Sequence, residues 1–373
     1  MNDFIEPIFN MHKIKFDKLD ELGLFYPTTK RANIFINLEA VFKVLINQRV
    51  ENQLRATGYD KNQLQLDFIS GIINLGQHYR LYCKKSRIDS KIILFWNYPR
   101  STYKNREYIG RYRDDYDKKM FRSDICPYIV DTLSEVHDLL TTTVSYVNEV
   151  YVVDGGVAES SMVPYILTRD DFLGPMDDSV QNIIISRFRY DYQYLGHGFT
   201  VLIPARDNSE ILTLENVVDY MKERTNIKNP LTVPGEQLPT LISILGDDHR
   251  GIPKLDGFGL SGACKTINGA IQSLKIASTT QSVELLCEIV PSHQKRTFIN
   301  NYRCVEFEYQ MSELTPKDIS YTQHQIEDKF NDDTLNELNE TTFRDCPLMI
   351  ISPRTEQVRN SERFHYDIKS IFS

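Results

Sequence analysis

Runs of apolar residues, many of them β-branched, recur along the first 205 residues of the chain. Almost every position within each run is apolar, which predicts strands buried on both faces of a parallel sheet. The predicted strands are 33–38, 91–96, 150–154, 182–186 and 199–204. Stretches with helical spacing lie between these runs, and this alternation predicts an α/β sheet with right-handed crossovers. The predicted helical stretches of this part are 39–54, 66–83, 127–147 and 160–168.

Beyond Pro204 the pattern becomes helical, with stretches at 213–225, 237–248 and 260–274. The first of these begins with a threonine, which caps helices well, and has acidic residues in its first turn. We therefore expect four parts in the chain. They are an N-terminal extension (1–32), an α/β domain (33–205), a mostly helical region (206–304) and a polar, irregular C-terminal extension (305–373).

The composition limits the classes of function. A net charge of −8 argues against a protein whose whole surface binds polyanions, although it leaves room for a local basic face. The six cysteines have no C-x-x-C spacing and the eight histidines form no H-x-x-x-H pair, so we expect no metal site built from these residues. We also expect no signal peptide and no membrane partner, because no apolar run approaches the roughly 20 residues of a membrane helix.

In a parallel sheet, functional residues gather at the carboxyl ends of the strands, near the point where the strand order reverses. The segments at these ends are "IFINLEAV", "ILFWNYP", "GVAESSMVPYIL" and "IISRFRYDYQYL", and "LGDDHRGIPKLDGFGLSGACKTI" follows in the helical region. In order and spacing they resemble the motifs of the 5′-nuclease family, which comprises flap endonucleases, phage 5′–3′ exonucleases and the nuclease domain of bacterial DNA polymerase I. The resemblance covers roughly residues 33–275. It implies a PIN-like parallel sheet flanked by helices, followed by a helix–turn–helix motif of the DNA-binding type.

Enzymes of this family hold two divalent metal ions with clustered carboxylates, because two cations stabilise both the attacking and the leaving oxygen of a phosphodiester. The corresponding positions here are Asn37, Asn97, Ala158, Ser160, Ser161, Phe188, Tyr190, Asp247 and Arg250. Only Asp247 among them has a carboxylate. Asp247 is kept in frame, whereas Glu159 and Asp191 are one place out of frame and are expected to point elsewhere. One carboxylate does not hold two Mg²⁺ ions, so we expect no metal and no cofactor. The simpler interpretation of the two serines is a helix cap.

Two segments correspond to DNA-contacting parts of the family. The stretch 100–122 matches the arch that guides single-stranded DNA, and it has a net charge of +4 with interleaved tyrosines. The segment "GFGLSGACK" matches the loop that contacts duplex phosphates. The resemblance thus implies a set of candidate DNA-contacting residues, namely Arg106, Arg111, Arg113, Lys254, Gly257, Gly259 and Lys265. The alternatives are a solvated helix with an aromatic face for the stretch, and a tight turn that needs glycine for the loop.

The loss of carboxylates favours a catalytically inactive 5′-nuclease-like protein that is reused as a structural or assembly component. Asn, Ile, Tyr, Lys and Asp are frequent, which indicates an AT-rich gene and suits a phage or another virus. We then expect the protein in the virion or the host cytoplasm, with other viral protein subunits, and DNA as a further candidate, as its partners. One alternative is a DNA-binding accessory of replication that does not cleave. The other is an active metal-dependent 5′–3′ exonuclease or flap endonuclease, which would use Mg²⁺ and the acids Glu159, Asp191, Asp247 and Asp248.

Two segments are not explained by the resemblance. Residues 1–30 are too apolar for a solvated tail, and 346–353 is a strand-like run in a polar region. We expect both segments to dock the nuclease-like core onto other protein subunits. The alternative is that they pack back on the sheet and complete the core of the monomer.

Overall fold

The fold was obtained as a computed structural model. It describes residues 5–97, 104–114, 126–143, 146–147, 150–169, 173, 177–205, 209–221, 232–273 and 287–324. Within these residues a sheet of seven strands has the order β3-β4-β2-β1-β5-β6-β7. The strands are β1 (Arg31–Asn37), β2 (Asp89–Trp96), β3 (Tyr146–Val147), β4 (Val150–Asp154), β5 (Val180–Ile185), β6 (Thr200–Ile203) and β7 (Glu210–Leu212).

The five central strands are parallel, and all five coincide with predicted strands. The fold class expected from the sequence, a mostly parallel α/β sheet flanked by helices, is therefore confirmed. Short antiparallel strands, β3 and β7, close the two edges of the sheet. They were not predicted, because two or three residues are too few to show a pattern. Strand β7 also corrects the expectation that the chain becomes helical directly after Pro204.

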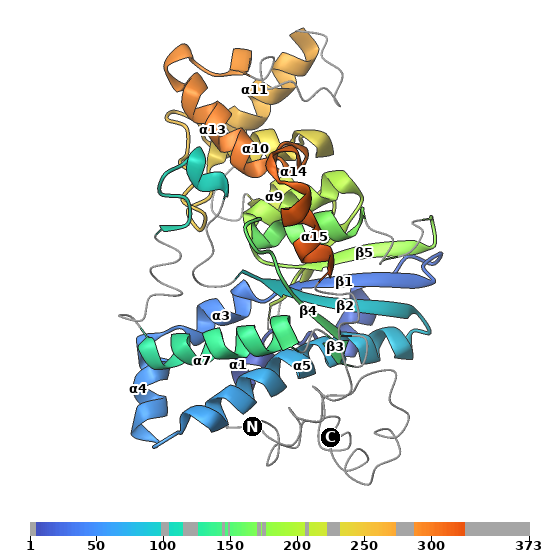
Figure 1. The fold of residues 1–373 in the computed structure, drawn as a ribbon. Coiled ribbons are helices and arrows are strands. Elements are labelled where there is room, and N and C mark those ends of the chain that lie inside the picture. The colour runs from blue at the N-terminus through green and yellow to red at the C-terminus, as the bar shows by residue number, and fades with distance from the viewer. Residues whose placement is uncertain are drawn as a thin grey trace.

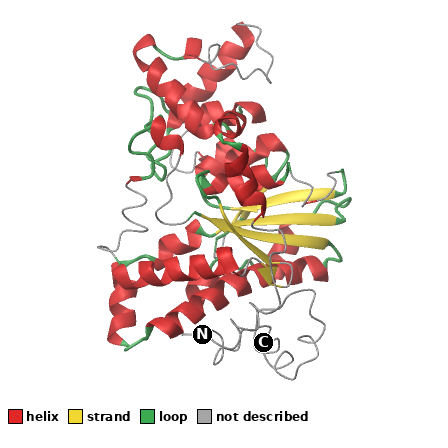
Figure 2. Ribbon diagram, in the orientation of Figure 1, coloured by secondary structure: helices red, strands yellow, loops and turns green. Residues whose placement is uncertain are grey.

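Alternate residues of each central strand enter two separate cores, which explains why the strand sequences are apolar throughout. On β1, Ile34 and Ile36 pack into one core and Phe35 into the other. The first core lies between the sheet and the helices drawn below it in Figures 1 and 2. The helical segments of this side are α1 (Glu6–Asn10), α2 (Phe16–Leu22), α3 (Glu39–Leu45), α4 (Gln48–Ala56), α5 (Lys61–Lys85), α7 (Pro127–Asp138) and the π-helical turn η2 (Leu139–Thr143).

Two predicted helices of this side differ in the structure. The stretch 39–54 is broken between α3 and α4, because Asn47 is extended and its side chain accepts a hydrogen bond from the Arg49 backbone N–H, which starts a new helix. The stretch 127–147 is α-helical to Asp138 and π-helical in η2, and its last two residues form β3 instead of a helix. At Asn47 a local hydrogen bond thus overrides the continuous apolar spacing.

Residues 5–30 of the N-terminal segment pack onto the chain's own core, which agrees with the alternative that this segment completes the monomer rather than docks other subunits. Ile5, Phe9 and Leu19 are fully buried in the first core. The Phe9 ring lies so close to α5 that a Cβ atom on Gly71 would be 2.4 Å from it. The apolar character of this segment therefore serves the monomer. The run 346–353 lies outside the described residues.

The second core lies between the other face of the sheet and the helices drawn above it in Figure 1. Short 3-10 turns and helices build this side. They are η1 (Lys104–Glu107), η3 (Ser160–Met162), α8 (Val163–Leu167), η5 (Arg189–His197), α9 (Val217–Met221), η6 (Gly235–Gln237), α10 (Leu238–Leu245), α11 (Leu260–Ser273), η7 (Cys287–Ile289), η8 (Ser292–Gln294), α13 (Lys295–Val305), α14 (Phe307–Glu313) and α15 (Pro316–His324). A loop, 246–259, joins α10 to α11, as the helix–turn–helix prediction required.

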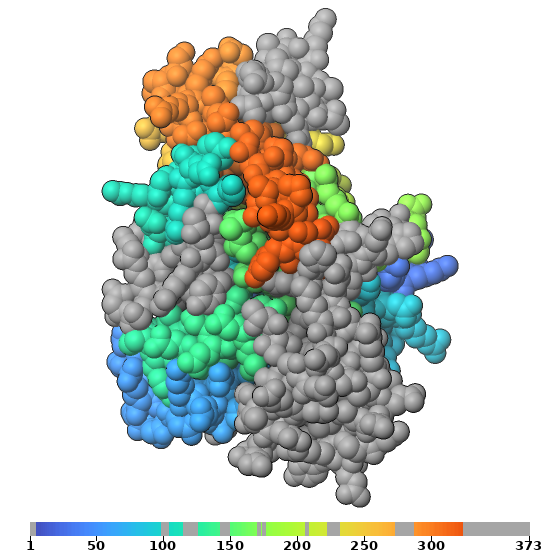
Figure 3. All heavy atoms as spheres, in the orientation of Figure 1, coloured from blue at the N-terminus to red at the C-terminus, as the bar shows by residue number. Residues whose placement is uncertain are grey.

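The beginning of the C-terminal extension is helical rather than irregular. Phe307 of α14 is fully buried in the second core, and Leu314 is buried at the end of this helix. On the face shown in Figure 3, α14 and α15 (orange to red) lie beside the loop 104–114 (teal). Within the described residues, no helix is long and apolar enough to cross a membrane.

Candidate functional site

The carboxyl ends of the central strands meet beside the point where the strand order reverses, between β1 and β5. Asn37 ends β1 and Asn97 follows β2, and both side chains are buried. The amide of Asn37 donates a hydrogen bond to Asp191 Oδ2 at 3.2 Å. The amide of Asn97 donates to the Ala158 carbonyl at 2.8 Å. Both amides thus act as donors that tie neighbouring segments to the edge of the sheet.

Arg250, from the loop 246–259, reaches into this edge and is buried. Its guanidinium lies over the Tyr190 ring, 4.1 Å from the ring centre, and donates a hydrogen bond of 2.6 Å to Ser161 Oγ. Its Nε is 3.4 Å from Glu159 Oε1, and its Nη1 is 3.9 Å from Asp247 Oδ2. Burial alone would lower the pKa of this guanidinium, but the surrounding carboxylates outweigh burial and raise the pKa well above its usual range. Arg250 is therefore a permanent cation among acids.

A second buried cation, Arg113, enters the same site from the loop 104–114. Its Nη2 donates to Glu39 Oε1 at 2.9 Å, and its Nη1 donates to Glu159 Oε1. The Tyr112 hydroxyl donates to the other oxygen of Glu159 at 2.8 Å, and Ser160 Oγ donates to Glu39 at 2.7 Å. Arg113 thus bridges two carboxylates that come from different parts of the chain. We call Glu39, Arg113, Glu159, Asp191, Asp247 and Arg250 the buried charge cluster.

The carboxyl groups of the cluster respond differently to burial. Burial raises the pKa of Glu39, but Arg113 and Arg250 outweigh this effect and hold it below its usual range. The pKa of Asp191 is raised, because burial outweighs the attraction of Arg250 and the hydrogen bonds from neighbouring side chains. Glu39 is therefore ionised at neutral pH, whereas Asp191 holds its proton more readily than an exposed aspartate.

Two acids point into the site although the sequence frame placed them outside it. Glu159 is not helical, with φ −62° and ψ 136°, and it precedes the 3-10 turn η3. Asp191 lies in the 3-10 turn η5, and its carboxylate accepts from Asn37 and Ser186. The α-helical frame used for the prediction therefore does not apply. Glu39 was missed altogether, although its place two residues after the end of β1 was a usable signal.

The candidate DNA-contacting residues separate into two groups. The burial of Arg113 removes it from the expected basic surface, and Arg106 is half-buried, 3.7 Å from Asp114. The others are exposed, namely Arg111, Lys254, Gly257, Gly259 and Lys265. Gly257 has φ +78°, a left-handed conformation that favours glycine. Residues 100–103 and 115–122 of the stretch lie outside the described residues.

The buried charge cluster does not fit a pair of divalent metal ions. Mg²⁺ needs several free oxygen ligands and space for its own water molecules. Here the oxygens of Glu39 and Glu159 already accept hydrogen bonds from Arg113, and Arg250 lies between Glu159 and Asp247. Among the residues described by the structure, no group of three His, Cys, Asp or Glu side chains is arranged to hold a metal ion.

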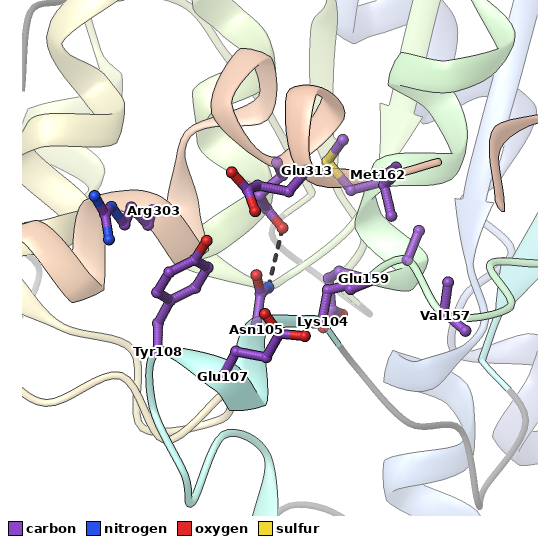
Figure 4. Close-up of a pocket in the computed structure, with 12 residues that line it drawn as sticks. Lys104, Asn105, Glu107, Tyr108, Val157, Glu159, Met162, Arg303 and Glu313 are labelled. Carbon is purple, nitrogen blue, oxygen red and sulfur yellow. Dashed lines mark hydrogen bonds between the residues drawn. The ribbon is translucent and has the colours of Figure 1, made fainter. Parts of the chain in front are cut away.

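A small cavity of about 10 Å³, roughly the volume of one water probe, lies beside Glu159 (Figure 4). The loop 104–114 forms one wall and helices α13 and α14 form the other. Asn105 donates a hydrogen bond of 3.0 Å to Gln310, and Arg303 lies 5.2 Å from the centre of the Tyr108 ring. These contacts hold the loop against the helices and leave little space for a ligand on this side.

Comparison with known proteins gives likeness to solved structures only. No protein-family model and no curated protein matches the chain. A bacteriophage T5 flap endonuclease in complex with DNA and metal ions is 14% identical, with 84% of this chain and 100% of that chain covered, at a TM-score of 0.46. The T5 5′-exonuclease with bound zinc is 14% identical over 84% of this chain and 98% of that chain, at a TM-score of 0.45. Likeness at this level says nothing about the activity of this chain.

Proposed function

We propose that this protein is a 5′-nuclease-like protein that does not hydrolyse phosphodiesters and that serves as a structural or assembly component, with other subunits of a virus as its partners. The observation that supports the proposal is the position of two guanidinium groups inside the carboxylate cluster. Arg113 and Arg250 bind the oxygens of Glu39 and Glu159 that a metal ion would need.

The two guanidiniums oppose a metal ion at this place. At an effective dielectric constant of about 20, two unit charges about 4 Å apart interact by about 4 kcal/mol, so each guanidinium at that distance repels a divalent ion by about 8 kcal/mol and cancels the attraction of one carboxylate. The guanidiniums are permanent cations, and a change of pH within the physiological range does not remove them. Without bound cations, the developing charge on the attacking and leaving oxygens of a phosphodiester is not stabilised.

The proposal is tested with 5′-flap, nicked and single-stranded DNA in Mg²⁺ and in Mn²⁺. We expect no cleavage by the wild-type protein. Asp247→Ala changes a buried carboxylate of the cluster, and Asp256→Ala changes an exposed aspartate of the same loop as a matched control. Metal-dependent cleavage that Asp247→Ala abolishes and Asp256→Ala leaves intact would overturn the proposal and support the active nuclease.

A second candidate function is that of a DNA-binding accessory that does not cleave. It is favoured by the exposed Lys254 and Lys265, which flank the glycines of the loop 246–259 and the start of α11. Each phosphate contact releases counterions, so duplex binding through this loop weakens steeply with salt. Lys254→Glu and Lys265→Glu then reduce the affinity, while Lys317→Glu, the same charge change on α15, does not. Absence of binding at low salt excludes this second function.

A further inference from the structure

A cleft of about 600 Å³ opens beside the buried charge cluster. Asp247 of the cluster and His249 line it, and the His249 ring lies 5.3 Å from the ring of Phe188. Its walls come from the residues after β5, from the loop 246–259, from the end of α9 and from the start of α11. This volume lies within the roughly 300–1,000 Å³ range of small-molecule sites. The cleft is therefore large enough for a ligand, unlike the small cavity beside Glu159.

Three exposed cationic side chains line the cleft. Arg187 and Arg189 follow β5, and Lys254 belongs to the loop 246–259. Arg189 donates to the Gly246 carbonyl at 3.3 Å. Among the described residues, none of these three side chains forms an ion pair with a carboxylate, in contrast to the two arginines of the buried charge cluster. Their charges are thus available for an anion, and guanidinium groups bind phosphate with particular geometric fit.

Other residues that line the cleft are aromatic and apolar. Tyr192 and Tyr220 form an edge-on pair with ring centres 6.0 Å apart, and Tyr220 is half-buried. Met221, Leu245 and Leu260 extend this wall. A planar ring gains dispersion and π contacts on such a surface. A simple anion would use only the cationic part of the cleft, and the apolar wall would contribute nothing to its binding.

One exposed acid sets a further condition on the ligand. Asp248 lines the cleft and is a strong hydrogen-bond acceptor. It repels a second phosphate, so it disfavours a continuous nucleic-acid backbone that crosses the cleft. A hydroxyl or amino group of a small ligand would satisfy it instead. The ligand that combines an anionic end, a planar ring and a donor group is a nucleoside phosphate.

We propose that this cleft binds a nucleoside phosphate, with the phosphate held by Arg187, Arg189 and Lys254 and the base placed against Tyr220 and Met221. The inference goes beyond the non-cleaving role and does not depend on it, because it involves no hydrolysis and no metal ion. A nuclease-fold protein of this kind would respond to a small nucleotide rather than process a strand.

The test is calorimetric titration of the full chain with adenosine 5′-monophosphate, adenosine, inorganic phosphate and a short single-stranded oligonucleotide without a terminal phosphate. We expect the nucleotide to bind at least about tenfold more tightly than the other three probes. The double variant Arg187→Ala/Arg189→Ala should lose this preference, whereas Arg49→Ala, which removes an exposed arginine from α4, should keep it.

Tyr220→Ala separates the two halves of the site. It should weaken binding of the nucleotide and leave weak binding of inorganic phosphate unchanged. Melting temperatures of all variants close to that of the wild type show that the protein remains folded. Equal affinity for adenosine and its monophosphate, unchanged nucleotide binding in the double arginine variant, or tighter binding of the oligonucleotide than of the nucleotide would each overturn the proposal.

Discussion

Arg250→Met tests the energetic role of the buried charge cluster. Methionine retains an apolar side chain of suitable length over the Tyr190 ring but removes the charge beside Glu159 and Asp247 and the hydrogen bond to Ser161. Removal of one partner of a buried ion pair leaves an uncompensated charge and costs roughly 3–5 kcal/mol. Because several carboxylates face Arg250, we expect a loss of this size at pH 7 and a fall of the melting temperature by roughly 4–6 °C.

The loss should depend on pH in a defined direction. Without the cation, the buried carboxyls have folded-state pKa values above those of the unfolded chain. The folded variant then binds more protons than the unfolded one, so its stability rises as the pH falls. We expect the difference between variant and wild type to be smaller at pH 5 than at pH 7.

Chemical unfolding followed by circular dichroism at both pH values measures this effect. Arg189→Met, the same change at an exposed position of the neighbouring segment, is the control and should stay within about 0.5 kcal/mol of the wild type. If Arg250→Met is equally harmless at pH 7, the guanidinium does not compensate the carboxylates and the reasoning about the site is refuted.

Two further predictions concern other parts of the chain. Glu39→Gln should destabilise the fold at pH 7, because the lowered pKa of Glu39 means that its ionised form stabilises the folded state. This contribution is present above the pKa of Glu39 in the unfolded chain and is lost as the pH falls through the folded-state pKa. The unfolding free energies of variant and wild type should therefore converge in acid. Phe9→Ala should cost roughly 3–5 kcal/mol of unfolding free energy in the same assay, because Phe9 is fully buried against α5. Met11→Ala, at a partly exposed position, is the control. A cost of Phe9→Ala below about 1 kcal/mol, similar to that of the control, would show that the N-terminal segment is not part of the core.

The sheet could be predicted from the sequence because its central strands are buried on both faces. Neighbouring residues such as Ile34 and Phe35 face opposite cores, so consecutive positions of the strand are apolar. A short run of consecutive apolar residues therefore indicates a buried strand. The gathering of Asn37, Asn97 and Ser160 at one edge was also predictable, because these residues lie at or shortly after the carboxyl ends of β1, β2 and β4. The edge strands β3 and β7 were too short to leave a pattern.

The interior of the site could not be predicted, since it depends on contacts between distant residues. Arg113 contacts Glu39 and Glu159, which are 74 and 46 positions away in the chain, and its basic neighbourhood suggested an exposed surface. Glu159 was excluded by an α-helical frame, whereas the backbone there is extended. Phe307 was hidden in a polar stretch, so the helices after residue 305 were overlooked. Composition shows that charges are present but not whether they point inward.

The most direct test of the central claim is binding of Mn²⁺ to the wild-type protein, followed by the electron paramagnetic resonance signal of the free ion. We expect the wild type and Asp247→Asn to bind Mn²⁺ equally weakly, because the guanidiniums of Arg113 and Arg250 lie against the oxygens of Glu39, Glu159 and Asp247. Tight Mn²⁺ binding by the wild type that is lost in Asp247→Asn would contradict the claim and would place a metal ion where the structure has a guanidinium.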